Sequence, residues 1–205
     1  MDKNIRVVNS VAAIVLAAGL STRMGQPKLL LEWGGKTVLQ AVLTTLHYAG
    51  IERIYTVIGA NREAIQNNIN SLPFPVETVF NPDYSNGEMS DSIKVGIRAV
   101  SHDASAVLIV LGDQPQMKGE VVRKLLDCYG KTNARIIVPS FQFRRGHPWL
   151  IKCGLWNELE NLNPSFTLRD FLRKYQDEIH YVVVDTPTVL QDLDTPEDYQ
   201  RAKPA

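Results

Sequence analysis

Residues 12–31 read A-A-I-V-L-A-A-G-L-S-T-R-M-G-Q-P-K-L-L-L, an apolar run that breaks into a glycine-punctuated loop. It begins with a short continuous apolar run, Ala12 to Leu16, of the kind expected for a strand buried on both faces. The next three residues, 17–19, are small and leave room for the backbone to approach a ligand closely. The stretch therefore predicts a buried strand that leads directly into a ligand-binding loop.

Two cationic residues, Arg23 and Lys28, lie in this predicted loop. Arginine binds phosphate as a bidentate fork, whereas lysine acts as a compact point charge that can follow a reacting phosphoryl group. Both kinds of contact are needed for phosphoryl or nucleotidyl transfer. The competing interpretation is a glycine-punctuated turn between a strand and a helix that binds nothing.

Two familiar nucleotide motifs are excluded by inspection. The pattern G-x-G-x-x-G is absent from the chain. Gly35-Lys36-Thr37 only imitates a Walker loop, because Leu30 stands where the first glycine of that motif should be. The chain is therefore predicted to be neither a common dinucleotide-binding fold nor a P-loop NTPase.

Along the rest of the chain, strand-like runs alternate with amphipathic stretches, which predicts an α/β fold: a doubly wound, mostly parallel sheet with helices on both faces. Apolar residues at helical spacing, such as Val38, Val42 and Leu46, indicate helix faces that pack on the core. The expected strands are 12–16, 53–58, 76–80, 106–111, 135–139 and 179–184.

Length and composition fit one enzyme domain spanning residues 1–205, with 44% hydrophobic residues and a formal net charge of zero. Without a basic block, we expect neither nucleic acid nor a membrane surface as a partner. Cys128 and Cys153 form no C-x-x-C pair, and two lone cysteines suggest reduced thiols and a cytoplasmic location. No apolar run approaches the roughly 20 residues that span a bilayer.

Two aspartates are candidate metal ligands. Asp113 follows the apolar run 106–111, so a parallel sheet would present its carboxylate at the edge where hard oxygen ligands could hold Mg²⁺. Asp192 and Asp194 flank Leu193 on one predicted extended segment and would project alike. The alternative for Asp113 is that it only caps the next helix. In the other segment, Thr195 and Pro196 form a strong helix start, and this capping does not require Asp192 and Asp194.

The loop as a whole resembles the L-A-A-G-x-S-x-R-M-G-x-P-K-x-L-L signature of MobA-like nucleotidyltransferases, matched from Leu16 to Leu30. The resemblance continues through N-P-D-Y-S-N-G-E-M-S-D-S-I at 81–93, L-G-D-Q-P at 111–115, R-R-G-H-P at 144–148 and D-L-D-T-P-E-D-Y at 192–199. Within that superfamily the segments look most similar to the molybdenum cofactor cytidylyltransferase branch.

The resemblance implies a Rossmann-like nucleotidyltransferase fold and transfer of CMP from CTP to the terminal phosphate of molybdenum-molybdopterin, with Mg²⁺ as cofactor and pyrophosphate as product. A molybdoenzyme or its chaperone is then a possible transient partner. The open alternatives are a nucleotidyltransferase acting on a sugar or polyol phosphate, and a non-catalytic carrier of the molybdenum cofactor.

By the same resemblance, the catalytic residues are Lys28 on the α-phosphate and Arg23 on the β,γ-phosphates, and the metal ligands are Asp113 and Asp194. The remaining assignments fall into two sets. The nucleotide-binding set is Leu16, Ala17, Ala18, Gly19, Ser21, Arg23, Gly25, Lys28, Asn61, Asn81 and Asp113. The acceptor-binding set is Gly87, Ser90, Ser92, Arg145 and His147.

Four features of the predicted site carry a finer prediction or an open alternative. Guanylyl-transferring relatives have glycine where this chain has Ala18, so its methyl group is expected to favour CTP, by only ~1–3 kcal/mol. Asn61 either contacts the nucleotide or simply starts the next helix. Asp91 replaces a serine of the family's usual run, and its carboxylate either repels an anionic acceptor or points away. Likewise, 144–147 is either a cationic loop over the substrate or a solvated hairpin.

Overall fold

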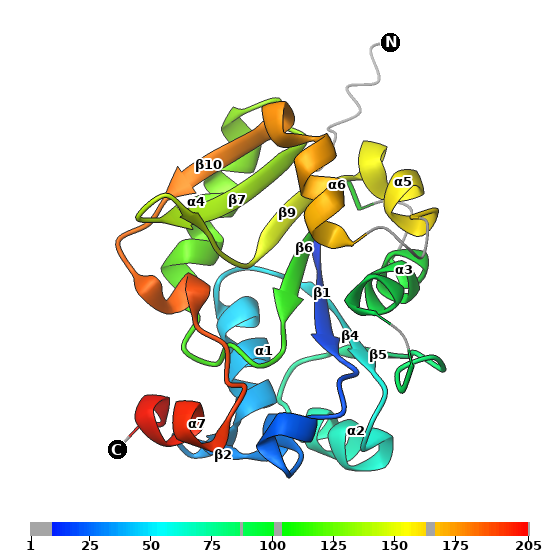
Figure 1. Cartoon of the computed structure of the whole chain (residues 1–205), viewed down its shortest axis with the longest axis vertical. Helices are drawn as coiled ribbons and strands as arrows, with labels where there is room; N and C mark the ends of the chain where they lie inside the picture. The colour runs from blue at the N-terminus through cyan, green and yellow to red at the C-terminus, as the bar shows by residue number, and fades with distance from the viewer. Residues whose placement is uncertain (1–9, 87, 101–103, 163–166, 205) are drawn as a thin grey trace.

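A computed structural model describes residues 10–86, 88–100, 104–162 and 167–204 of the chain. Its centre is an eight-stranded sheet in the order β10-β7-β9-β6-β1-β4-β5, with β8 paired to β7 (Figure 1). The strands are β1 (Val11–Ala17), β4 (Arg53–Ile58), β5 (Glu77–Phe80), β6 (Ala106–Leu111), β7 (Ile136–Phe141), β8 (Arg144–Arg145), β9 (Trp149–Lys152) and β10 (Ile179–Val183).

The predicted α/β fold is confirmed, and all six predicted strands form within two residues of their expected ends. Strands β6, β1, β4 and β5 are mutually parallel, and β10 is parallel to β7. The six-strand prediction omitted β9, which lies antiparallel between β6 and β7. Only a short connection separates β7 from β9, too short for the crossover that a parallel pairing needs.

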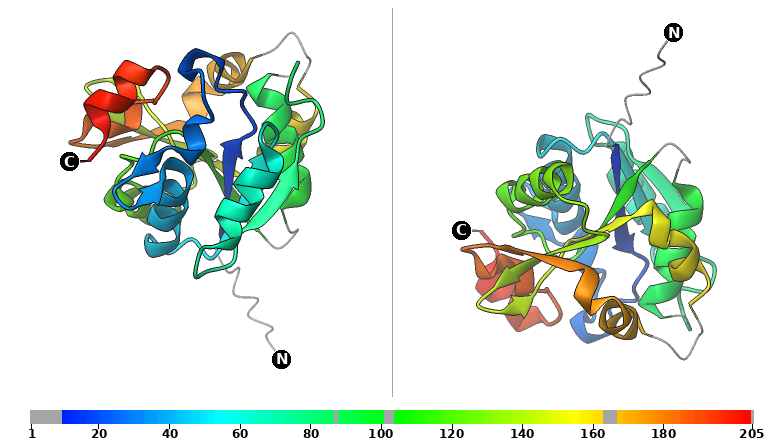
Figure 2. Two further views of the ribbon diagram at one scale, coloured as in Figure 1. Left: turned by 90° about the horizontal axis from the view of Figure 1, so that it is seen from below. Right: turned by 90° about the horizontal axis from the view of Figure 1, so that it is seen from above.

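Helices cover both faces of the sheet, as predicted (Figure 2). One face packs on α1 (Val38–Tyr48), α2 (Arg62–Asn70) and α4 (Gly119–Lys131), and the other on α3 (Met89–Ala99), α5 (Trp156–Glu160) and α6 (Leu168–Lys174). The side chains of strand β1 point alternately to the two faces of the sheet and so contribute to both hydrophobic cores. Ala13 and Val15 face the first set of helices, and Ala12 and Ile14 face the second.

The remaining elements are short. They are the helix α7 (Pro196–Ala202), the hairpin strands β2 (Glu32–Trp33) and β3 (Lys36–Thr37), and the 3-10 turns 22–24, 28–30, 153–155, 176–178 and 187–190. No helix in the described ranges is long and apolar enough to cross a membrane.

The triplet that imitates a Walker loop belongs to the β2–β3 hairpin: Gly35 lies in its corner, and Lys36 and Thr37 form β3. Gly34 and Gly35 have φ of 57° and 77°, the two consecutive left-handed positions that a two-residue hairpin loop requires. Thr37 then begins α1, where its side chain accepts a hydrogen bond from the backbone N–H of Gln40. The exclusion of a P-loop is therefore consistent with the local structure.

The topology creates a crevice at the carboxyl ends of β1 and β6. After β1 the chain adds β4 and β5 on one side of that strand, and then returns to place β6 on the other side. Ligands of open α/β sheets bind outside the carboxyl ends of the strands, at the point where the strand order reverses. The loops that follow β1 and β6 therefore lie where a substrate is expected.

Candidate active site

The loop after β1 is folded back on itself and anchored to the core. Met24 and Leu29 are buried, and the backbone N–H of Lys28 donates to Ser21 Oγ at 3.3 Å. Ser21 and Gly25 both adopt positive φ, 55° and 70°, which produces the tight reversals around the first 3-10 turn. With its two apolar residues fixed in the core, the loop presents its cationic side chains to the crevice.

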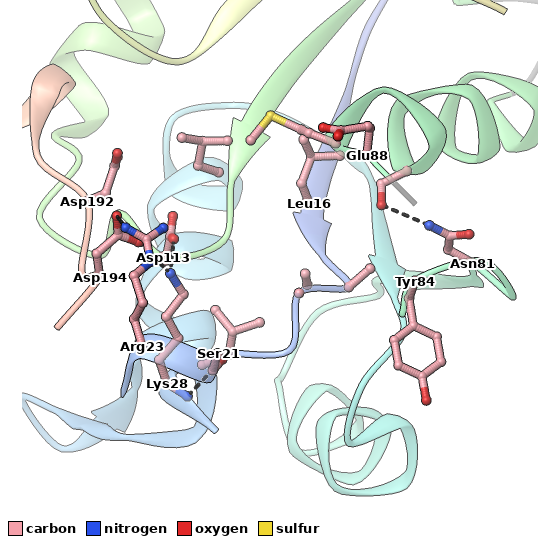
Figure 3. Close-up of a pocket in the computed structure, with 17 residues that line it drawn as sticks. Leu16, Ser21, Arg23, Lys28, Asn81, Tyr84, Glu88, Asp113, Asp192 and Asp194 are labelled. Carbon is pink, nitrogen blue, oxygen red and sulfur yellow. Dashed lines mark hydrogen bonds and ion pairs between the residues drawn. The ribbon is translucent and has the colours of Figure 1, made fainter. Parts of the chain in front are cut away.

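Lys28 lies between two carboxylates from distant parts of the chain (Figure 3). Its Nζ donates to Asp194 Oδ1 at 3.2 Å and forms a second ion pair with Asp113. Arg23 Nη1 lies 2.9 Å from the other oxygen of Asp194. The four side chains form a cluster of two cations and two anions at one wall of the crevice.

Backbone contacts hold both aspartates in place. The N–H of Gly112 donates to Leu16 O at 3.0 Å, which ties the start of the Asp113 loop to the end of β1. A Cβ atom at Gly112 would lie 2.8 Å from that carbonyl oxygen, so the close approach requires glycine. The N–H of buried Leu193 donates to Asp113 O at 3.2 Å, and this bond carries Asp194 to the same place.

The end of the Asp194 segment follows the sequence prediction. Thr195 is the N-cap of α7, its hydroxyl accepts from the backbone N–H of Asp198, and Pro196 is the first helical residue. Capping therefore accounts for Thr195 and Pro196, while Asp194 is left to face the cations.

The electrostatics of the cluster follow from burial and proximity. Burial by itself lowers the pKa of Lys28, but the charges and hydrogen bonds of Asp113 and Asp194 outweigh it and raise that pKa above its ordinary 10.5. Burial in the cavity wall raises the pKa of Asp192. The hydrogen bond from Gln114 Nε2, at 2.6 Å, opposes this rise in pKa, whereas the negative charges of Asp113 and Asp194 increase the rise. Lys28 is therefore cationic at neutral pH.

The opposite wall comes from β5 and the start of α3 (Figure 3). Asn81 is buried; its Nδ2 donates to Ser92 Oγ at 3.0 Å, and its Oδ1 accepts from the backbone N–H of Asp83 at 3.0 Å. Asn81 thus organises the loop that presents Tyr84. Glu88 and Met89 complete this wall.

Between these walls lies a cavity of about 350 Å³, and it opens into a second of about 940 Å³. The two share four lining residues: Glu88, Met89, Leu111 and Asp192. The second cavity extends from this boundary toward β8, β9 and α6. The arrangement is a two-part cleft with the ion-pair cluster in its smaller part.

Most of the residues predicted to form a site face this cleft. Those that line the first cavity are Leu16, Ala17, Ala18, Gly19, Ser21, Arg23, Lys28, Asn81, Ser92, Asp113 and Asp194. Those that line the second are Ser90, Arg145 and His147.

Two of the described residues that were predicted to form the site line neither cavity. Gly25 is an exposed turn residue, and Asn61 is the exposed N-cap residue of α2, without a side-chain capping bond. Their contact with a nucleotide stays a prediction. Gly87 lies outside the described residues.

The structure decides between the alternatives left open for two segments. Asp91 accepts from the backbone N–H of Glu88 at 2.9 Å and pairs with Lys94 at 3.3 Å, so its carboxylate is turned into its own helix end. Residues 140–145 form a hairpin with Gln142 and Phe143 at its corner, as one interpretation expected, yet Arg145 on β8 and His147 after it line the second cavity.

Several lining residues were not predicted from the sequence. They are Tyr84, Glu88, Met89 and Leu111, together with Trp149 and a group on and around α6: Thr167, Leu168, Arg169, Leu172, Arg173 and Gln176. The α6 segment carries no motif, so only its position in the fold identifies it.

The donor set at Asp113 and Asp194 fits a hard divalent cation, because two carboxylates already share one cation at that point. Within the described residues, no group of three or more His, Cys, Asp or Glu side chains could hold a metal. Phosphate oxygens of a substrate and water would therefore have to complete the coordination, which is the usual manner of Mg²⁺ in nucleotide sites.

A crevice at the switch point of an α/β sheet, lined by a small-residue loop with arginine and lysine, defines a nucleotide-binding enzyme. Residues 13–179 match the MobA-like NTP transferase domain, and the chain belongs to that family. It is a nucleotidyltransferase, and enzymes of this family generally use a divalent metal.

Two curated relatives match nearly the whole chain. The molybdenum cofactor cytidylyltransferase of Escherichia coli K12 is 30% identical over 205 residues, covering 96% of this chain and 97% of the relative. The nicotine blue oxidoreductase of Paenarthrobacter nicotinovorans is also 30% identical, over 200 residues, covering 93% and 95%. Identity alone therefore does not select the reaction.

A solved structure with a similar fold is that of Rv0371c from Mycobacterium tuberculosis H37Rv, with a TM-score of 0.81, 27% identity, and coverage of 94% of this chain and 97% of that one. The same protein has been solved in complex with manganese, with a TM-score of 0.76 to this chain, 26% identity, and coverage of 94% and 97%. The Rossmann-like nucleotidyltransferase fold implied by the sequence resemblance is confirmed.

Proposed function

We propose that this chain transfers CMP from CTP to the terminal phosphate of molybdenum-bound molybdopterin and releases pyrophosphate, with Mg²⁺ as the metal. The observation that carries the proposal is the position of Lys28 between Asp113 and Asp194, at the end of a cavity lined by the loop after β1. The near full-length similarity to the Escherichia coli cytidylyltransferase supports this choice of reaction.

In the proposed reaction, a terminal phosphate oxygen of the acceptor attacks the α-phosphorus of CTP. A new P–O–P bond forms, the bond between the α-phosphorus and the bridging oxygen breaks, and pyrophosphate leaves with the electron pair. A phosphate monoester is largely ionised at neutral pH, so no protein base is required. No covalent intermediate on the protein is required either.

The residues of the chain supply charge and position. The ammonium of Lys28 neutralises the α-phosphate, and the guanidinium of Arg23 binds the β,γ-phosphates as a fork. Asp113 and Asp194 hold Mg²⁺, which when bound would offset the negative charge of the triphosphate and of departing pyrophosphate. The buried methyl group of Ala18 in the cavity wall narrows the space for a base and favours cytosine.

The second cavity is proposed to receive the acceptor, with Ser90, Arg145 and His147 in its wall. His147 stacks on Trp149 at 4.4 Å between ring centroids and 17° between planes. Burial lowers the pKa of His147 to about 4, so its ring is neutral under physiological conditions. A neutral imidazole can both donate and accept a hydrogen bond, which suits a heterocyclic substrate.

The test is pyrophosphate release by the purified protein with Mg²⁺ and each of CTP, GTP, ATP and UTP in turn, with either molybdenum-bound molybdopterin or a panel of sugar and polyol phosphates as the acceptor. Release with CTP, together with the CMP-modified pterin by mass spectrometry, is the expected result. Release only with a sugar or polyol phosphate would show that this phosphate, and not molybdopterin, is the acceptor. Binding of CTP without release on any acceptor would favour the carrier function.

A further inference from the structure

The wall of the second cavity formed by α6 is the feature of the cleft that the proposed reaction leaves unused. Helix α6 contributes Leu168, Arg169, Leu172 and Arg173, and Gln176 follows the helix end. In Figure 1 the helix lies beside β9, from which Trp149 enters the same cavity. Two leucines and two arginines of α6 thus line the second cavity together with the indole ring of Trp149.

Three apolar residues, Trp149, Leu168 and Leu172, form what we call the floor of this cavity. Trp149, Leu168 and Leu172 are all buried, with 7%, 8% and 3% of their surface exposed. The indole N–H of Trp149 already donates to Gly146 O at 2.8 Å, so the ring offers the cavity an apolar surface. Such a floor favours a planar ring over the hydroxyl groups of a sugar, because buried hydroxyls need hydrogen-bond partners.

The size of the second cavity also favours a ring-bearing ligand over a small sugar phosphate. At about 940 Å³ it is much larger than the neighbouring 350 Å³ cavity. Its volume lies near the upper end of the ~300–1,000 Å³ typical of pockets for drug-sized ligands. A small sugar phosphate would leave most of that space to water.

The charged residues that line only the second cavity are cationic. Arg145, Arg169 and Arg173 line it, whereas its two acidic residues, Glu88 and Asp192, lie at the boundary with the first cavity. Arg173 pairs with Asp170 at 3.1 Å. Among the described residues, no hydrogen bond or ion pair is found for Arg169.

Arg169 and Arg173 lie four residues apart on α6, and this spacing lowers the stability of the helix. Residues four apart on a helix are neighbours on its surface, and like charges there repel each other and destabilise the helix. An anion between the two guanidinium groups would turn the repulsion into a binding contribution.

We propose that α6 is the acceptor-recognition wall of this enzyme: Arg169 and Arg173 bind an anionic group at the end of the acceptor remote from its reacting phosphate, above a floor of Trp149, Leu168 and Leu172 that holds a planar ring. The acceptor class is then a ring-bearing phosphate ester with a second anionic group. The inference rests on the proposed function in assigning the second cavity to the acceptor.

The experiment measures binding directly and needs no reaction. Pterin-6-carboxylate, a planar ring with one anionic group, is titrated into the full-length protein by calorimetry in parallel with neutral 6-hydroxymethylpterin and with glycerol 3-phosphate. We expect the carboxylate to bind on the order of tenfold tighter than the neutral pterin, the loss typical of one partly exposed ion pair. Glycerol 3-phosphate is expected not to displace it.

Variants on α6 separate recognition from folding. Arg169→Gln is expected to weaken pterin-6-carboxylate about tenfold, to leave 6-hydroxymethylpterin unchanged, and to keep or slightly raise Tm because the repulsion with Arg173 is removed. Arg169→Lys should restore part of the affinity. Lys174→Gln is the matched control, since Lys174 lies on the same helix but pairs with Glu158 outside the cavity.

Equal affinity of wild type and Arg169→Gln for pterin-6-carboxylate would overturn the inference, as would equal binding of glycerol 3-phosphate. Failure of CMP transfer is a separate outcome. If the pterin binds through Arg169 but no CTP is consumed, the recognition wall stands and the proposed reaction does not. If transfer occurs, Arg169→Gln should raise the acceptor KM while the CTP KM and kcat stay near wild type.

Discussion

Replacing Lys28 with methionine separates two effects that the ion-pair cluster combines. The substitution keeps the length of the side chain and removes the ammonium that Asp113 and Asp194 share. If Lys28 stabilises charge that develops during transfer, its loss should lower kcat on the order of 10²- to 10³-fold, as does loss of one preorganised charge donor elsewhere. The same change should make the two carboxylates better ligands for a metal.

The expected gain in metal affinity follows from the geometry of the ion pair. Lys28 Nζ is 3.2 Å from Asp194 Oδ1, and the two side chains are 15% and 32% exposed. Unit charges about 3 Å apart attract by about 5 kcal/mol at an effective dielectric constant of 20, before desolvation is subtracted. Measured pairs with this degree of exposure retain about 1 kcal/mol. Removing the competing ammonium should therefore tighten the binding of a divalent ion about fivefold.

The assay for the metal is a Mn²⁺ titration followed by electron paramagnetic resonance, without nucleotide, and the assay for transfer is pyrophosphate release. Lys36→Met is the matched control, because Lys36 lies on the exposed β2–β3 hairpin away from both cavities. Unchanged or weaker Mn²⁺ binding in Lys28→Met would refute the shared-ligand arrangement. Wild-type turnover in the same variant would refute the catalytic role.

Three further predictions test the base pocket, the backbone and the second cavity. Ala18→Gly should raise the GTP-to-CTP ratio of kcat/KM by about 10- to 200-fold, and an unchanged ratio would remove Ala18 from base selection. Gly112→Ala should cost about 1–3 kcal/mol in urea unfolding, because the new Cβ would meet Leu16 O at 2.8 Å, whereas Gly130→Ala meets nothing within 4 Å and should stabilise its helix. The pKa of His147 lies at about 4 in the fold against an ordinary 6.5, so the unfolded chain binds the extra proton first. Stability should fall as pH drops from about 6.5 to about 4, by at most about 3 kcal/mol, and His147→Asn should flatten that slope in denaturation curves.

The crevice could be predicted because its parts follow strands. An apolar run such as 106–111 indicates a buried strand, and whatever follows it must lie at the edge of the sheet. Residues after β1 and β6 therefore had to lie close together, and Lys28 and Asp113 do. The pairing of Arg23 with Asp194 could not be predicted in this way, since Asp194 arrives on a C-terminal segment held by the backbone of Leu193.

The second cavity had no comparable signal. Arg169 and Arg173 look like the polar face of any amphipathic helix, which normally faces water. They face a cavity because β9 enters the sheet antiparallel and brings Trp149 beneath α6. A short antiparallel strand inserted into a mostly parallel sheet leaves little trace in the sequence pattern, so the space it helps to form is also missed.

Asp91 shows how a local hydrogen bond can change the meaning of a substitution. A carboxylate in a segment expected to bind an anionic acceptor suggests repulsion if it is considered alone. In the structure its charge is compensated by the N–H of Glu88 and the ammonium of Lys94, and an acid in the first turn is favourable to the helix dipole. Glu88 is the acid of this segment that an anionic acceptor would meet, because it lines both cavities. It lies at their junction, on the wall opposite the ion-pair cluster (Figure 3), and away from the arginines that line only the second cavity. A phosphate ester whose second anion reaches α6 would therefore bind with each of its charges toward a cation.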